Sequence, residues 1–376
     1  MSSSRKRSYL VAYLNLALPL LLVGAPAAAE AANYSFTDLG TLGGASIYSV
    51  ATAINNKGQV VGYSWSTGYA TQNAMLWNGT VATDLGAQTG SDHSSARGIN
   101  DNGVVVGTSG YYNPLATVWS GGIAAKLGLE TGWDESSGLD INNSGTVVGW
   151  STIGGLGNKA TAWTGITPTM GTLNSQYWAI NNSGQMAGVS GGTVGHATLW
   201  DGTTVTDLGS LGGSNSVSVG LGINDLKQVV GWSATANGSD HAALWRPAST
   251  AVDLGTLGGD NSAAFAINES GQVVGRSNLT AGSSSTHAML WDGTSLADLN
   301  DLIDSAAKSD GWVLVDAQDI NDKGWIVGQA YNSKTHVWHA YLLSDGAAST
   351  VPEPASIVLA GLGLAGIVLN RRRKGR

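Results

Sequence analysis

The chain contains no cysteine and only two phenylalanines among its 376 residues. Without cysteine no disulfide bond can hold the fold, so its stability must come from a packed core and hydrogen bonds. Basic residues are also scarce in the body of the chain: residues 32–350 contain 10 Lys and Arg against 24 Asp and Glu. An acidic surface of this kind repels nucleic acid and anionic lipid, so we expect no nucleic-acid partner.

The short motifs of several common chemistries are missing as well. The sequence has no phosphate-binding GxxxxGK[ST] loop and no HExxH metal motif. The segment 319–324 (DINDKG) lacks the spacing and the final Glu of an EF-hand loop. We therefore predict neither a cofactor nor a dedicated metal site, and weak Ca²⁺ binding by acidic loops stays open.

Sustained helical periodicity is absent, and the 54 glycines disfavour helices. The sequence instead contains a repeat that begins with Ile-Asn and reaches a Gly seven residues after the Asn. Each copy continues with a segment such as NAMLW and, in most copies, another such as TDLG, which gives four short apolar segments in a period of 39 to 53 residues. This period is typical of a β-propeller blade. The Asn of each copy is Asn55, Asn100, Asn142, Asn181, Asn224, Asn268 and Asn321.

The Asn-x-x-Gly step predicts a tight turn between the first two strands of each blade. An Asn that opens a type I turn hydrogen-bonds the backbone two residues ahead, and the Gly adopts the left-handed conformation without steric cost. In one copy, NDLK, Lys227 replaces this Gly. We therefore expect a strained or rearranged turn in that blade.

Two further repeated residues have a structural and a functional interpretation. The Trp that ends the third strand of six copies is predicted to pack between neighbouring blades, because stacked sheets need wide, flat side chains; a sugar-binding platform is the alternative. The His of four copies would lie too far apart around a ring to share a metal, so we expect buried, hydrogen-bonded roles for His196, His241, His287 and His339. The Asp residues of the TDLG segments are predicted to be turn and edge residues.

Counting strands predicts how the ring closes. The first strand-like segment, residues 34–39, has the sequence of a fourth strand, whereas the last repeat ends with its third strand at residues 339–343. The first strand of the chain should therefore complete the last blade, because closure removes the free sheet edges that recruit other chains. We predict an all-β fold, a seven-bladed β-propeller of four-stranded antiparallel blades over residues 32–346.

The strings DLGTLGG (residues 38–44 and 253–259) and AINxxGQVVG (residues 53–62 and 266–275) resemble those of the HAF-type extracellular repeat family. The His-Ala pair, followed here by Met, Thr, Ala or Tyr, is similar to the triplet that names the family. The resemblance extends over nearly all of residues 34–343. It implies an extracellular repeat protein and no particular activity.

Residues 1–31 have the pattern of a cleaved signal peptide. Basic residues at the start are followed by an apolar run at residues 16–29 and by small residues. A membrane-spanning helix is the alternative, but the run is shorter than the roughly 20 residues that a bilayer requires. We therefore expect the chain to be exported across the inner membrane.

Residues 347–376 contain a linker, the segment VPEPAS, an apolar run at residues 357–369 and a basic tail. These three parts in this order resemble the PEP-CTERM sorting signal. The resemblance implies that Pro352, Glu353 and Pro354 form the motif cut by an exosortase-type membrane protease, with the apolar run as a transient inner-membrane anchor. A permanent anchor is the alternative.

Antiparallel strand order places the loops between second and third strands on the same face as the connections between blades. These segments vary between copies, and loops on a rigid scaffold commonly carry recognition. We predict a binding face there, with Tyr111 and Tyr112 as exposed aromatic side chains and Trp133 as a further ligand-binding residue.

One connection on that face, residues 129–138, could carry chemistry. It places Glu130, Asp134 and Glu135 beside Trp133. Two carboxyl groups next to an aromatic ring are what a glycosidase uses as acid and as base or nucleophile, although solvated loop acids are much commoner.

Our leading hypothesis is an exported, non-enzymatic propeller at the cell surface or in the extracellular matrix that binds carbohydrate or a surface protein. A polysaccharide-active enzyme that uses the region of Glu130 and Glu135 is the first alternative. A structural matrix protein without a discrete ligand, kept soluble by its acidic surface, is the second.

Overall fold

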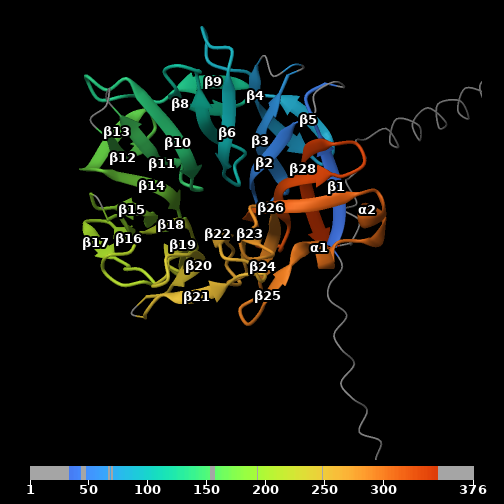
Figure 1. Ribbon diagram of the computed structural model, residues 1–376. Helices are drawn as coiled ribbons and strands as arrows, with labels where there is room; N and C mark the ends of the chain where they lie inside the picture. The colour runs from blue at the N-terminus through green and yellow to red at the C-terminus, as the bar shows by residue number, and fades with distance from the viewer. Residues whose placement is uncertain are drawn as a thin grey trace, which may run out of the picture. The chain divides into compact units, whose positions relative to one another are not determined.

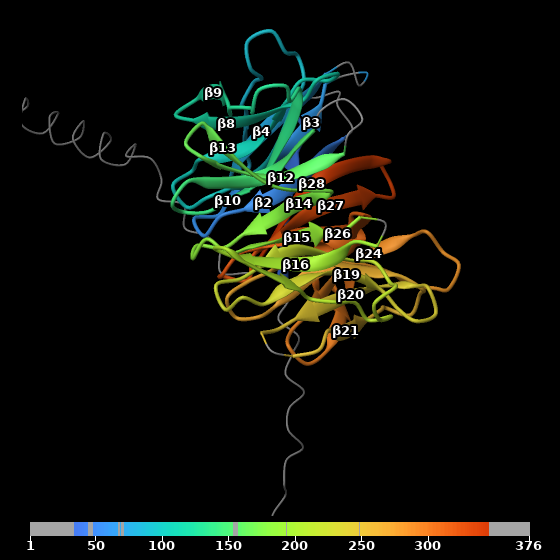
Figure 2. The same ribbon diagram turned by 90° about the vertical axis from the view of Figure 1, so that its left-hand side faces the viewer.

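The computed structural model describes residues 34–43, 48–66, 68, 71–152, 157–192, 194–247 and 249–345. These residues form seven separate four-stranded antiparallel sheets arranged around a common axis (Figures 1 and 2). The prediction of a seven-bladed β-propeller is confirmed. The signal-peptide segment and the whole sorting signal lie outside the described residues.

In blades 1 to 6 the four strands follow one another in sequence, and the first strand lines the axis. Blade 1 is β2 (Ser49–Ile54), β3 (Gln59–Trp65), β4 (Gln72–Asn78) and β5 (Val81–Asp84). Blade 2 is β6 (Ser94–Ile99), β7 (Val105–Ser109), β8 (Leu115–Ser120) and β9 (Ile123–Lys126). Blade 3 is β10 (Glu135–Ile141), β11 (Thr146–Thr152), β12 (Asn158–Thr164) and β13 (Thr167–Leu173).

Blade 4 is β14 (Ser175–Ile180), β15 (Met186–Ser190), β16 (His196–Asp201) and β17 (Thr204–Asp207). Blade 5 is β18 (Ser218–Ile223), β19 (Val229–Ala234), β20 (Asp240–Trp245) and β21 (Val252–Gly255). Blade 6 is β22 (Ser262–Ile267), β23 (Val273–Asn278), β24 (Thr286–Trp291) and β25 (Leu296–Asp298). Blade 7 combines β26 (Trp312–Ile320), β27 (Ile326–Asn332) and β28 (Val337–Asp345) with β1 (Tyr34–Gly40) from the start of the chain.

Strand β1 closes the ring as predicted. It pairs antiparallel with β28, with Phe36 opposite Leu343 and Asp38 opposite Tyr341. The rings of Phe36 and Tyr341 are stacked with centroids 6.1 Å apart. Closure therefore joins segments about 300 residues apart and leaves no blade with three strands.

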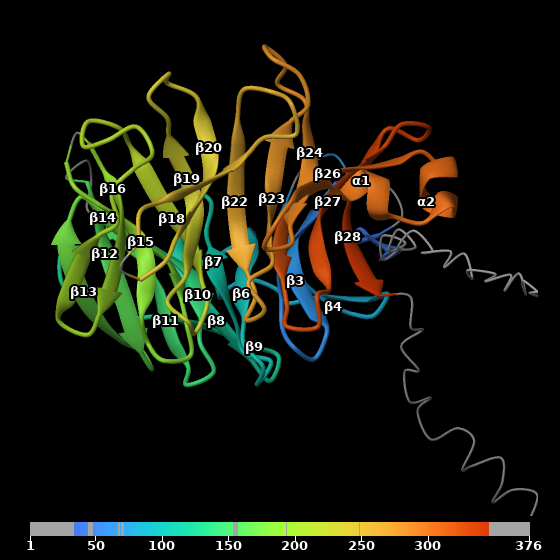
Figure 3. The same cartoon turned by 90° about the horizontal axis from the view of Figure 1, so that it is seen from below.

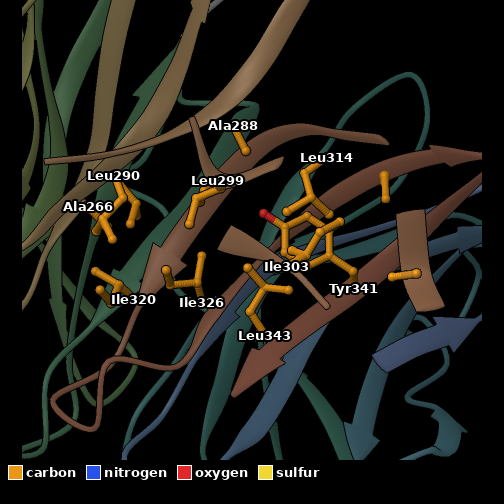
Figure 4. Packing of buried hydrophobic residues seen from close by; sticks show 14 residues of the cluster. Ala266, Ala288, Leu290, Leu299, Ile303, Leu314, Ile320, Ile326, Tyr341 and Leu343 are labelled. Atoms are coloured by element: carbon orange, nitrogen blue, oxygen red, sulfur yellow. The ribbon is translucent and has the colours of Figure 1, made fainter. Parts of the chain in front are cut away.

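The long interval before the last repeat contributes to this closure. It contains two short helices, α1 (Leu299–Leu302) and α2 (Ser305–Ser309), whose N-caps are Asp298 and Asp304. The carboxylate of Asp304 accepts a hydrogen bond from the backbone N–H of Phe36 at 2.9 Å. Leu299 and Ile303 pack with Tyr341 and Leu343 in the core between blades 6 and 7 (Figure 4). The extra residues thus hold β1 in place.

The two ends of the ring differ in the segments that they present (Figure 3). The tight turns after the first and third strands of each blade lie at one end, which we call the turn face. The loops between second and third strands, and the connections between blades, lie at the other end, the loop face. Because β28 is a third strand, its last residue, Asp345, lies at the turn face, where it accepts a hydrogen bond from the indole of Trp325 at 2.8 Å.

The repeated Asn does more than open a turn. In blade 1 the side-chain oxygen of Asn55 accepts hydrogen bonds from the backbone of Lys57 and Gln59, as predicted, and Gly58 has a φ of +83°. Its side-chain N–H₂ group also donates to the backbone carbonyl of Asn100 in blade 2. The equivalent bond recurs at every junction between blades, including the one from Asn321 back to Asn55. The seven asparagines therefore form a closed belt of hydrogen bonds around the axis.

The turn that lacks Gly keeps the conformation of the others. Lys227 has a φ of +59°, in the left-handed region that favours glycine, and its N–H still donates to the carbonyl of Asn224. The prediction of strain in this blade is confirmed. The ammonium of Lys227 forms an ion pair with Asp201 at 2.7 Å.

The repeated Trp packs between blades as expected, and the repeated His is hydrogen-bonded as expected but half-buried rather than buried. Trp119, 2% exposed, packs against Ala53, Val61 and Ala74 of the preceding blade, and five other copies occupy the equivalent place. Each repeated His places its Nδ1 within hydrogen-bond distance of the Asp on the neighbouring outer strand. The pairs are His196 with Asp207, His241 with Asp253, His287 with Asp298 and His339 with Asp38.

Candidate functional site

An aromatic cleft opens on the loop face between blades 1 and 2. It has a volume of about 740 Å³ and is lined chiefly by residues 88–93 and 109–113, together with Trp65. Tyr111 and Tyr112, which the sequence marked as exposed aromatics, are 63% and 85% exposed. The structure thus places both predicted residues in one cavity.

The aromatic rings of the cleft contact one another in a row. The ring centroids of Trp65 and His93 are 6.3 Å apart, those of His93 and Tyr111 are 4.8 Å apart, and those of Tyr111 and Tyr112 are 4.9 Å apart. Tyr111 and Tyr112 meet edge to face, which leaves ring faces of this pair available for a ligand.

Local backbone structure holds this row in position. Gly110 has a φ of +113°, which lets the chain turn sharply at the end of β7, and its N–H donates to the carbonyl of His93 at 2.9 Å. The imidazole of His93 lies 2.8 Å from a carboxylate oxygen of Asp92. The two segments that form the cleft are therefore bonded to each other beneath the exposed rings.

The other predicted site residues lie elsewhere on the loop face. Trp133 is half-buried, and the ammonium of Lys159 lies over its ring, 5.4 Å from the centroid. Glu130 and Asp134 are exposed, and Glu135 begins β10. None of the four lines the aromatic cleft or the pocket on the axis. The glycosidase hypothesis stays a prediction. If the protein hydrolyses a polysaccharide with these acids, Glu130→Gln or Glu135→Gln should abolish turnover, and unchanged turnover would exclude them.

A second cavity, the axial pocket, lies on the axis and was not found from the sequence. It has a volume of about 430 Å³ and is lined by the first strands of the blades. The residue three positions before each repeated Asn forms a β-bulge in its strand, because pairing with the second strand skips it. The residues at this position are Thr52, Arg97, Leu139, Trp178, Leu221, Phe265 and Gln318, and all of them line the axial pocket.

Two carboxyl groups also line this pocket. The position before Ile-Asn is Ala or Gly in five repeats, but Asp140 and Asp319 occupy it in blades 3 and 7. Each carboxylate accepts the backbone N–H of its own next residue and that of an Ile in the next blade, Ile180 for Asp140 and Ile54 for Asp319. This departure from a small residue was the signal in the sequence that could have revealed the pocket.

Burial in the protein raises the pKa of both carboxyl groups. Burial raises the pKa of the Asp319 carboxyl from 3.8 to about 7, and the negative charge of Asp140 adds to the shift. Burial likewise raises the pKa of Asp140, against the opposing effect of the two backbone N–H groups that it binds. Ionisation of either group in the folded protein is therefore penalised.

Replacing Asp319 with Asn should flatten the dependence of stability on pH. A carboxyl whose pKa is higher in the folded than in the unfolded state adds stability below the unfolded value of 3.8, and this stability is lost as the pH rises through 7. Between pH 5 and pH 8 the loss for the natural protein should be about 2 to 3 kcal/mol. Asn does not ionise. Calorimetry should therefore show that the Tm of the variant rises relative to the Tm of the natural protein as the pH increases. Parallel Tm curves, or the same gain for the exposed Asp134→Asn, would contradict this assignment.

Acidic and amide side chains surround the axis at the turn face. The side chain after each repeated Asn accepts the backbone N–H of the preceding blade, which gives a second closed belt. Its members are Asn56, Asp101, Asn143, Asn182, Asp225, Glu269 and Asp322. Within the described parts of the chain, no group of three or more His, Asp or Glu side chains is placed to hold a metal ion.

Comparison with known proteins supports the sorting signal. Residues 350–374 match the PEP-CTERM protein-sorting motif, which is the signal predicted from the VPEPAS segment. This motif is a substrate signal for exosortase and implies export with membrane-associated sorting. Among the described residues no helix is long and apolar enough to cross a bilayer. No curated protein matches the chain.

Solved structures similar to this chain are distant in sequence. A puromycin-hydrolyzing peptidase of Mycobacterium tuberculosis aligns with a TM-score of 0.51 and 11% identity over 82% of this chain and 56% of its own. The β-propeller domain of the Trilobed protease from Pyrococcus furiosus aligns with a TM-score of 0.49 and 9% identity, over 80% of this chain and 96% of that domain. TolB from Acinetobacter baumannii aligns with a TM-score of 0.38 and 13% identity, over 52% of this chain and 51% of its own. This chain thus spans about half the length of the peptidase and of TolB.

Proposed function

We propose that the chain is a HAF-type propeller that, once exported and sorted, binds carbohydrate of the cell surface or extracellular matrix at the aromatic cleft, without catalysing a reaction. The observation that carries this proposal is the row of aromatic rings from Trp65 to Tyr112 on the loop face. The rest of the proposal follows from what such a surface binds and from the face on which it lies.

The chemistry of the cleft suits a sugar. Each pyranose ring has faces of C–H groups that pack on aromatic rings, and hydroxyl groups at its edge that need hydrogen-bond partners. Tyr111 and Tyr112 supply exposed rings, and Gln88, His93 and Asn113 supply polar groups beside them. An aromatic floor with a few polar groups is the usual composition of a small-molecule site.

The position of the cleft suits display at a surface. The sorting signal follows β28, which ends at the turn face, whereas the cleft lies on the loop face. A propeller tethered through this end would present the cleft away from the tether. In this proposal an exosortase-type protease acts at Pro352, Glu353 and Pro354, the apolar run 357–369 anchors the chain transiently in the inner membrane, and the partner is an extracellular polysaccharide or a glycosylated surface protein.

A glycan array with the exported protein tests this function. We expect retention of a defined set of oligosaccharides, and at least tenfold weaker binding for Tyr111→Ala/Tyr112→Ala, which corresponds to about 1.4 kcal/mol. The Tyr111→Phe/Tyr112→Phe variant keeps both rings and should retain most of the affinity. Trp133→Ala, outside the cleft, serves as the matched aromatic control and should bind as the natural protein does. A protein that retains no glycan would instead favour a structural matrix role.

A further inference from the structure

The aromatic cleft and the axial pocket each share lining residues with a third cavity. This third cavity, of about 280 Å³, lies between them, at the seam of blades 1, 2 and 3. It shares His93, Gly110 and Tyr111 with the cleft and Arg97 with the axial pocket. The lining of the third cavity thus extends from Tyr111 at the rim to Arg97 at the axis.

Arg97 is an exposed cation at the junction of the third cavity and the axial pocket. Its guanidinium lies over the ring of Tyr63, 6.0 Å from the centroid, and forms no hydrogen bond or ion pair with other described residues. The body has 10 basic and 24 acidic residues, and Arg97 is the only Lys or Arg among the described residues that line the axial pocket or the third cavity. Its planar set of N–H donors matches a carboxylate in two parallel hydrogen bonds.

The two acids of the axial pocket are already hydrogen-bonded to the backbone. The oxygens of Asp140 and Asp319 already accept backbone N–H groups. The indole N–H of Trp178 has no hydrogen-bond acceptor among the described residues, but it is fully buried, so a ligand in the pocket does not reach it. Arg97 is exposed and is the charged donor of this pocket, so a ligand that fills the space should bring oxygen acceptors toward it.

We infer that the glycan bound in the aromatic cleft is acidic, and that its acidic group, a carboxylate of a uronic acid or a sulfate, enters the axial pocket at Arg97. This inference rests on the proposed function and specifies its ligand class. The acids that face the pocket, Asp140 and Asp319, and Asp316 near Tyr63, disfavour a densely charged chain. They leave room for one acidic group at the arginine.

Calorimetric titration of the exported protein with matched hexasaccharides tests this inference. The probes are a neutral galactose hexamer, the same hexamer with one galactose replaced by galacturonic acid, and the same hexamer with one sulfate. We expect the galacturonic acid or the sulfated probe to bind at least tenfold more tightly than the neutral one, and the stronger of the two identifies the acidic group. Arg97→Gln should reduce this preference to less than twofold, and Arg97→Lys should restore part of it. Lys126→Gln, which removes an exposed charge from an outer strand, is the control and should leave the preference unchanged.

The outcomes separate this inference from the proposed function. Equal affinity for the three probes, or a preference that survives in Arg97→Gln, overturns the inference alone. The inference also fails if none of the probes binds while neutral glycans on the array are still retained through Tyr111 and Tyr112. Glycan binding that Tyr111→Ala/Tyr112→Ala leaves unchanged overturns the proposed function instead. Tm measurements on each variant confirm that the propeller is folded.

Discussion

Replacing Gly149 with Ala is expected to lower the free energy of unfolding by more than about 3 kcal/mol, the upper part of the range for overpacking. A Cβ at this position would lie closer than 3.0 Å to the backbone carbonyl oxygen of Ser137 on the neighbouring first strand. Only backbone movement could relieve that contact, and β11 is held by pairing with β10 on one side and with β12 on the other. Denaturant unfolding followed by tryptophan fluorescence measures the loss.

Gly145→Ala in the same blade is the matched control. Gly145 closes the turn with a φ of +84°, and a Cβ there meets no atom within 4 Å. Its substitution should cost only about 1 to 2 kcal/mol, from backbone strain. Equal costs for the two variants would show that the close approach of strands does not determine the requirement for Gly149. The same approach occurs at the corresponding Gly of all seven blades: Gly62, Gly107, Gly149, Gly188, Gly231, Gly275 and Gly328.

Replacing Asn142 with Ala should cost about 2 to 4 kcal/mol, because it leaves buried backbone groups without partners. Its side-chain oxygen accepts the backbone N–H of Thr146, and its N–H₂ group donates to the carbonyl of Asn181 in the next blade. Asn142 is only 4% exposed, so water cannot replace these bonds without a rearrangement. Thermal unfolding should show a lower Tm for the variant.

The adjacent Asn143 provides the comparison for this prediction. It belongs to the second belt, which is exposed at the turn face, so water can replace a lost hydrogen bond there. Asn143→Ala should therefore cost less than about 1 kcal/mol. If Asn142→Ala were as mild, the inner belt would not contribute to closure of the ring.

The fold could be predicted because the sequence repeats the same turn and strand patterns seven times. Asn and Gly specify the turn, apolar residues specify strands, and the displaced strand at residues 34–39 specifies how the ring closes. The function of the Gly in strand β11 and its equivalents could not be read in the same way. Its position repeats in the sequence, but the carbonyl that excludes a side chain belongs to another strand.

The site was predicted only in part, for a related reason. Tyr111 and Tyr112 stood out because they are aromatic residues in a variable loop, and both line the cleft. His93 and Trp65 belong to different repeats and join them only because blades 1 and 2 are adjacent. Trp133, a neighbour on the same predicted face, lies outside the cleft, since sharing a face does not determine which loops touch.

Local chemistry in the sequence by itself determined the number of blades, their strand order and the tight turns, because each depends on residues close together in the chain. Only the tertiary structure decided which side chains meet at the axis. Arg97, Asp140, Trp178 and Asp319 come from four different blades, and circular closure brings them around one pocket. Their burial, and the raised pKa of Asp140 and Asp319, follow from that closure, because desolvation depends on the protein assembled around a group.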